Sequence, residues 1–315
     1  MVEEHMNRNY RQFFEVALLS CMWGPAFLWT KMALVEVGPL SIVTCRIGFG
    51  GLLLLLILSL WKVNLKSLPR SIWIHSAILG FFANGFPWAC FAESVRHIPI
   101  STSALINGSV PILTIILANL FLIDEKLSRY RVLGVLLGLS GFLLIVLMPL
   151  LNTDADTMGV DTIVPPSLWG MSLCFFGSLS YAIAIVYAKR FLTQAPPLVV
   201  PTIQLLSSLF YLVPLTMVIE GPQGLLNAST QYWMLLGLLA LFSTICAFIL
   251  YHRIIRQYGA TASSMVTYLL PIIVTVLGVI FLDETIDHTF WLAALLIFSG
   301  VFVVNMKSPL AEPSI

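Results

Sequence analysis

Charged side chains are scarce in this sequence, and their scarcity excludes most ordinary protein classes. Only 10% of its 315 residues are Asp, Glu, Lys or Arg, whereas 59% are apolar, and the formal net charge is +1. A soluble domain is about a quarter charged, so this chain cannot cover a globular surface with polar groups. A nearly neutral chain also has no basic surface for a nucleic acid. We therefore expect a membrane protein with no nucleic-acid partner.

The motifs of several common chemistries are missing as well. The five cysteines have no C-x-x-C spacing and all lie inside apolar runs, so neither a zinc site nor a disulfide framework is expected. The sequence contains no H-E-x-x-H motif, no serine–histidine–acid set and no G-x-x-x-x-G-K-[ST] motif. These absences predict no enzyme activity, no catalytic residue, no metal, no cofactor and no ATP-binding subunit.

What the sequence does have is a series of apolar runs about 20 residues long. As a helix, each run can cross about 30 Å of hydrocarbon. The runs do not alternate with polar residues at period two, which argues against a membrane barrel. We predict an all-α polytopic membrane protein with ten transmembrane helices. The expected spans are 13–35, 39–61, 72–95, 99–123, 130–150, 167–189, 197–219, 231–254, 260–282 and 289–306.

Basic residues predict the orientation of these spans. If the N-terminus is cytoplasmic, 13 of the 16 Lys and Arg residues fall in cytoplasmic segments, and only Lys31, Arg46 and Arg96 do not. An excess of Lys and Arg marks the cytoplasmic side of a membrane protein. The pattern predicts a multi-pass protein of the inner (plasma) membrane with both termini in the cytoplasm.

The chain repeats itself at a displacement of about half its length. Pro111 and Pro271 lie 160 residues apart, and Ser140-Gly141 matches Ser299-Gly300 at 159. Such self-similarity indicates a duplication, with a first repeat over 13–150, a second over 167–306 and a loop between them. Five spans per repeat is an odd number, so the second copy must insert upside down. We therefore predict two inverted five-helix repeats related by an axis in the membrane plane.

Each repeat contains a set of residues typical of one protein family. In the first repeat they are Trp23, Gly24, Lys31, Pro39, Arg46, Ser101, Ser103, Pro111, Glu125, Gly134 and Gly141. In the second they are Tyr251, Arg256, Ala260, Ala262, Ser263, Pro271, Glu284 and Gly300. On these residues the chain resembles the drug/metabolite transporter superfamily, in its ten-helix branch with two EamA-type domains. The resemblance covers about 13–306. It implies a central cavity lined by spans 1–4 and 6–9, with spans 5 and 10 packed outside.

Polar and aromatic residues near the middle of the spans are the candidate substrate ligands, because polar groups at membrane depth are costly and usually face a cavity. The predicted substrate-binding residues are Trp23, Asn84, Trp88, Asn107, Tyr181, Ser243, Thr244 and Tyr268. Four prolines lie near them: Pro25, Pro87, Pro111 and Pro271. Each proline either kinks a continuous helix or marks a helix interrupted at the site.

Charged residues inside or beside the spans are expected to act in gating or charge pairing. These are Lys31, Arg46 and Glu93. Arg46 lies about seven residues inside its span and needs a partner or water, and the sequence leaves Glu36 and Glu93 open as that partner. No acid lies at mid-depth, so we expect facilitated transport or exchange rather than tight proton coupling.

Two other features have structural interpretations. The pairs Asp124-Glu125 and Asp283-Glu284 are interpreted as N-terminal caps of spans 5 and 10, because an acid is favourable before a helix start. The small-residue pair Gly134 and Gly138 is expected to pack against a neighbouring span rather than to form a dimer.

Together these features predict a secondary transporter that works by alternating access around a midplane cavity. Its substrates would be small neutral, zwitterionic or cationic metabolites resembling amino acids, and the family precedent points to export. One alternative is uptake of a small quaternary or amine cation such as choline, since aromatic pockets hold such groups. The other is a scaffold or receptor without transport. The expected partners are a small-molecule substrate and the lipid bilayer, with the protein a monomer or weak dimer.

Overall fold

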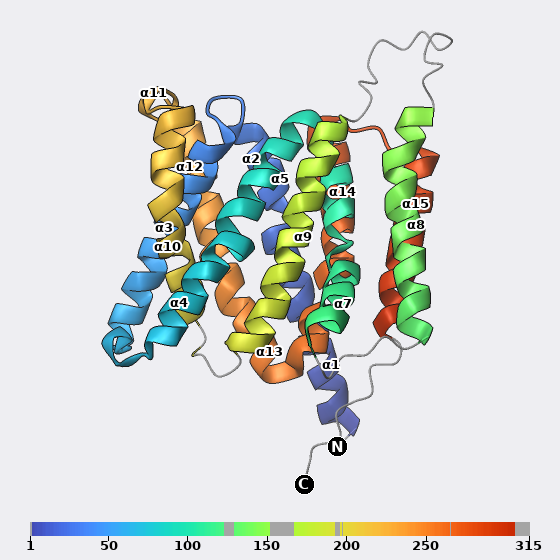
Figure 1. Cartoon of the computed structure of the whole chain (residues 1–315), viewed down its shortest axis with the longest axis horizontal. Coiled ribbons are helices and arrows are strands. Elements are labelled where there is room, and N and C mark those ends of the chain that lie inside the picture. The colour runs from blue at the N-terminus through green and yellow to red at the C-terminus, as the bar shows by residue number, and fades with distance from the viewer. Residues whose placement is uncertain are drawn as a thin grey trace.

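The computed structural model describes residues 2–122, 129–151, 167–192, 196, 198–264 and 266–305. In these ranges the regular elements are all helices (Figure 1). The first five spans are α1 (Val2–Trp23) with α2 (Pro25–Ala33), α3 (Pro39–Leu60), α4 (Arg70–Leu79) with η2 (Gly80–Gly85) and α5 (Phe86–His97), α6 (Ile100–Asn107) with α7 (Val110–Phe121), and α8 (Arg129–Leu151). The other five are α9 (Leu168–Phe191), α10 (Val199–Ile219), α12 (Thr230–Ala240) with η4 (Leu241–Cys246) and α13 (Ala247–Ser264), α14 (Val266–Leu282), and α15 (His288–Asn305).

The helices confirm the all-α prediction. Seven segments of the described chain are long and apolar enough to cross a membrane, and two shorter apolar segments, Leu269–Leu282 and His288–Val303, follow. Two helices extend beyond the predicted spans: α1 begins at Val2 instead of 13, and α13 continues to Ser264, so the first residues of predicted span 9 belong to it. Glycine lowers helix stability by about 1 kcal/mol but does not stop a helix, and α13 continues through Gly259.

Helices that meet across the molecule have matching positions in the two halves. Spans 2 and 7 pack as α3 against α10, spans 4 and 9 as α6 against α14, and spans 5 and 10 as α8 against α15. The backbone N–H of Leu40 at the start of α3 bonds Glu220 just after the end of α10, so these two helices run in opposite directions. This arrangement is the one expected of inverted repeats around an axis in the membrane plane.

In Figure 1 the short helix α11 (Gln223–Leu226) lies at the top and the N-terminal part of α1 at the bottom. We call these the α11 end and the α1 end of the bundle. The pair α8 and α15 stands together at one side. This position agrees with the implied packing of spans 5 and 10 outside the others.

Glycines allow α8 and α15 to approach closely. A Cβ atom added at Gly300 would lie 2.5 Å from the Gly134 carbonyl oxygen and 2.6 Å from the Gly138 backbone nitrogen. Small residues permit such backbone contact between membrane helices. The prediction that Gly134 and Gly138 pack against a neighbouring span is therefore confirmed, and that span is α15.

Several spans change their helical hydrogen-bond pattern near their middles, while the linking residues keep helical backbone angles. Pro25, Pro87 and Pro111 occupy the first or second position of a new helical segment, where a missing N–H costs least. Pro271 instead lies inside the continuous helix α14. The first three prolines therefore lie where the helical hydrogen bonding changes locally, and Pro271 lies within the regular helix α14.

The caps of span 10 differ from the prediction. Asp287 accepts a hydrogen bond from the backbone N–H of Phe290 at 2.7 Å and caps α15. Glu284 instead accepts hydrogen bonds from the backbone N–H groups of Ile100, at 2.5 Å, and Ser101, at 3.1 Å, at the start of α6. The interpretation of Asp283-Glu284 as the cap of span 10 is thus wrong, because the inverted packing brings unsatisfied N–H groups of α6 beside Glu284. Asp124-Glu125 lies outside the described residues.

Candidate functional site

Arg46 on α3 is the centre of a polar group in the interior of the bundle. Its Nε donates to Thr244 Oγ1 at 3.0 Å, and its Nη2 donates to the Ser243 carbonyl oxygen at 3.3 Å. Its Cζ lies 3.9 Å from the centroid of the Trp88 ring on α5. A guanidinium over an indole face is a favourable cation–π contact. Three spans therefore meet at one cationic side chain.

The backbone carbonyl that faces Arg46 lies in a π-helical turn. Ser243 and Thr244 lie in η4, and both are fully buried. A π-turn breaks the regular α-helical hydrogen bonding and is frequent at functional sites. The first half has a matching π-turn, η2, which starts at Gly80, 161 residues before Leu241. Two interrupted segments thus occupy corresponding positions of spans 3 and 8.

Tyr181 on α9 extends the group. Its hydroxyl accepts a hydrogen bond of 2.7 Å from Trp88 Nε1, and its ring stacks on Phe91 with centroids 5.6 Å apart. The Trp88 indole, whose face lies against Arg46, is therefore also held at its N–H edge by Tyr181. We call Arg46, Trp88, Tyr181, Ser243 and Thr244 the Arg46 group.

The structure brings together four of the eight predicted substrate-binding residues, Trp88, Tyr181, Ser243 and Thr244. Trp23 instead packs on the Tyr251 ring, at 5.5 Å between centroids. Asn84, which is 2% exposed, and Asn107 have Oδ1 atoms that are buried without a hydrogen-bond partner within the described structure. The side chain of Tyr268 lies outside the described residues.

Lys31, Arg46 and Glu93, the residues expected to act in gating or charge pairing, do not pair with one another in the described structure. Glu93 binds Arg96 at 3.2 Å and His97 at 2.8 Å, both one turn along its own helix. Neighbours at three and four positions on a helix meet readily. Lys31 Nζ donates to the carbonyl oxygen of Val95 near the end of α5. Glu93 is therefore occupied locally and does not reach Arg46.

Glu36, the other expected partner of Arg46, is occupied as well. It accepts hydrogen bonds from the Ser229 backbone N–H at 2.7 Å and from the Ser229 hydroxyl at 2.6 Å. These bonds favour the ionised form and lower the pKa of Glu36. Within the described residues, no ion pair includes Arg46.

The sequence analysis did not identify acids that cap a helix of the other half. Glu220 directly follows span 7 and accepts hydrogen bonds from the start of α3, the helix that carries Arg46. The signal was available, because an inverted repeat places the end of span 7 beside the start of span 2. An acid at that position is therefore a candidate cap for a helix of the other half.

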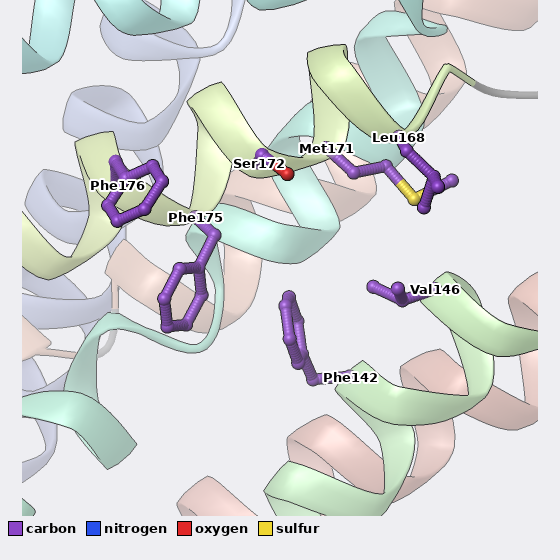
Figure 2. A pocket seen from close by; sticks show the side chains of 7 residues that line it. All are labelled: Phe142, Val146, Leu168, Met171, Ser172, Phe175 and Phe176. Atoms are coloured by element: carbon purple, nitrogen blue, oxygen red, sulfur yellow. The ribbon is translucent and has the colours of Figure 1, made fainter.

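A separate hollow of about 140 Å³ lies between α8 and α9. Figure 2 shows side chains of the two helices facing each other across it. Its lining is Phe142, Val146, Leu168, Met171, Ser172, Phe175 and Phe176. The lining has a single hydroxyl, that of Ser172, among aromatic and aliphatic groups, so the hollow suits a hydrocarbon chain. None of the predicted site residues line it.

With this geometry in view, comparison with known proteins decides the family. The EamA-like transporter family matches residues 14–147 and 168–306. The chain belongs to this family. An EamA-like transporter with a helical, largely apolar structure is a polytopic membrane protein, which agrees with the spans described above.

Relatives with similar sequences carry transporter names. The "Uncharacterized inner membrane transporter YedA" of Escherichia coli strain K12 is 26% identical over 290 residues, which cover 91% of this chain and 88% of YedA. The "Uncharacterized transporter YyaM" of Bacillus subtilis is 26% identical over 262 residues and 82% of each chain. A solved crystal structure with 19% identity has a TM-score of 0.63 over 94% of this chain and 96% of its own, and it supports the fold alone.

Proposed function

We propose that this EamA-like transporter is a secondary transporter for small zwitterionic metabolites, amino-acid-like in chemistry, and that the Arg46 group binds their carboxylate. The observation that carries the proposal is the guanidinium of Arg46, which contacts neutral oxygens and an indole face but no carboxylate of the described residues. A charge in a low-dielectric interior needs a counter-charge. A substrate carboxylate would supply it.

The remaining donors of Arg46 suit a carboxylate. A guanidinium has five N–H donors, and two of them have partners in the described structure. Arginine binds a carboxylate through two parallel hydrogen bonds. A single arginine suits one carboxylate better than a phosphate ester, whose double charge needs several basic residues. The positive charge also disfavours choline, the cationic alternative, by like-charge repulsion.

The proposed cycle is alternating access between the two halves, 13–150 and 167–306, in the inner membrane. The basic residues of the loops favour an orientation with the α1 end in the cytoplasm and the α11 end outside. The family precedent favours export. The bilayer and a small molecule are then the partners, with the protein a monomer or weak dimer.

Labelling tests this orientation. A single cysteine in place of Asn64, in the α3–α4 connection, should react with an impermeant reagent only from the cytoplasmic side. A cysteine at position 156 should react from outside. Labelling of position 156 from the cytoplasm alone would show that the protein has the opposite orientation.

A ligand screen tests the proposed substrate class. The purified protein is heated with single amino acids, with choline and with sugar phosphates, and the unfolding temperature is measured. A zwitterionic amino acid should give the largest stabilisation, because ligand binding to the folded state raises stability by mass action. Counterflow of that ligand in proteoliposomes then separates a transporter from a receptor, which would bind without exchange. Choline or a phosphate ester as the tightest ligand would contradict the proposal.

Replacing Tyr181 with phenylalanine should weaken binding up to about tenfold. The change leaves the ring in place but removes the acceptor of Trp88 Nε1, so the indole beside Arg46 loses the hydrogen bond that positions it for the ligand, a bond worth about 0.5–1.5 kcal/mol. The matched control is Tyr187→Phe on the same helix, which removes a hydroxyl bonded to His75 Nδ1 at 2.7 Å. Binding titrations should show the loss for position 181 and near wild-type affinity for position 187.

A further inference from the structure

Three glutamates at the α11 end each bind a helix start in the opposite half. Glu36, after α2, accepts from Ser229, the N-cap of α12. Glu220, after α10, accepts from the N-terminus of α3. Glu284, after α14, accepts from the N-terminus of α6. We call these contacts the carboxylate clamps.

The Glu220 clamp shows how strong such a contact is. Its two carboxylate oxygens accept from the backbone N–H groups of Leu40 and Ser41, both at 2.8 Å, and from the Ser41 hydroxyl at 2.6 Å. Hydrogen bonds to a charged acceptor are stronger than neutral ones. The positive end of the helix dipole adds attraction. One turn deeper, the hydroxyls of Thr44 and Thr216 lie 2.7 Å apart and join the same two helices.

The halves are joined differently at the α1 end, as far as the described residues show. An apolar cluster there combines Leu58 of the first half with Val199 and Ile203 of the second. Glu15 on α1 pairs with Arg253 on α13 at 3.0 Å, between side chains rather than onto a helix start. Among the described residues, hydrogen bonds donated by backbone N–H groups to carboxylates across the two halves therefore distinguish the α11 end.

We propose that Glu36, Glu220 and Glu284 form the gate at the α11 end of the transporter, and that all three clamps break when the interior opens toward that end. This rests on the proposed function in one respect, that the halves separate in alternating access. The clamps suit a gate because each joins the two halves, and water can solvate both the carboxylate and the freed N–H groups once the halves part. Two-state elements of this kind underlie conformational switching.

Accessibility from outside tests the gate without a substrate. A reporter cysteine replaces Thr44, which is buried beneath the Glu220 clamp, in a background whose five native cysteines are alanine. Intact cells are treated with an impermeant maleimide. Glu220→Gln, Glu36→Gln and Glu284→Gln should each raise the labelling rate about tenfold, since a weakened clamp increases the open population.

Asp287→Asn is the matched control. Asp287 also follows α14 at the α11 end, but it accepts its hydrogen bond from the backbone N–H of Phe290 in the same half and joins no halves. Its labelling rate should equal that of the parent. Equal rates in all four variants would overturn the proposal, because glutamine at the clamps would then leave the closed state unchanged.

A distance measurement is independent of the reporter cysteine. Spin labels at Val35, 86% exposed, and Leu226, 75% exposed, report the separation of the two halves at the α11 end. The triple glutamine variant should add a population with a longer distance. An unchanged single distance would contradict the gate, whereas a failed ligand screen would affect only the assignment of the Arg46 group.

Discussion

Replacement of Arg46 by glutamine is expected to lower substrate affinity by about 30-fold or more. Truncating one partner of a desolvated, hydrogen-bonded charge pair costs about 2–5 kcal/mol, and about 1.4 kcal/mol corresponds to a factor of ten. Arg46→Lys keeps the charge but loses the planar fork and the stacking on Trp88, so we expect an affinity about tenfold below wild type. Binding titration of the best ligand from the thermal screen measures both effects.

The unfolding temperature without ligand separates binding from a purely structural role. Arg46→Gln removes a cation that has no carboxylate partner among the described residues, so its apo form should unfold within a few degrees of wild type while the ligand-induced shift disappears. Arg96→Gln is the control, because Arg96 is exposed and pairs with Glu93. A large loss of apo stability with the ligand shift retained would show that Arg46 holds the fold instead of the substrate.

Of all the substitutions considered, Gly300→Val should cause the largest decrease in the free energy of unfolding. The added Cβ would lie 2.5–2.9 Å from backbone atoms of Gly134 and Gly138, and backbone cannot move aside as a side chain does. Overpacking of a close interface costs about 1–3 kcal/mol and occasionally more. We expect the pair α8 and α15 to separate, with a decrease of several degrees in unfolding temperature and a lower yield of monodisperse protein.

Gly237→Val in α12 is the matched control for this effect. A Cβ at Gly237 would meet no atom within 4 Å, so the same substitution in a helix introduces a β-branched residue without a clash. Its unfolding temperature should stay close to wild type. Equal losses at positions 237 and 300 would assign the effect to helix propensity and not to the contact between α8 and α15.

The helical class was predictable because the signal is local. A run such as 39–60 is apolar over the thickness of a bilayer, and no tertiary information is needed to recognise it. The inverted arrangement followed from an odd number of spans per repeat. The end of α13 was not predictable, since Gly259-Ala260 resembles a break and the helix continues through it.

The partners of the charged residues were the part that local rules could not supply. Arg46 bonds Thr244, a residue 198 positions away, and Glu284 bonds the N–H of Ile100, 184 positions away. A capping rule considers only the next helix, which explains the wrong assignment of Glu284. Glu93, left open as a partner of Arg46, instead binds Arg96 and His97 one turn away on α5, because neighbours on one helix meet more readily than a distant residue.

The two π-turns have a consequence for stoichiometry. Both halves have the turn, but the guanidinium that meets η4 has no counterpart beside η2. The residues 158 to 161 positions after Arg46 are Gln204, Leu205, Leu206 and Ser207, none of which is charged. Under the proposed function, the described part of this duplicated framework thus has one candidate anion-binding centre, so one carboxylate should cross per conformational cycle and the binding isotherm should saturate at one ligand per chain.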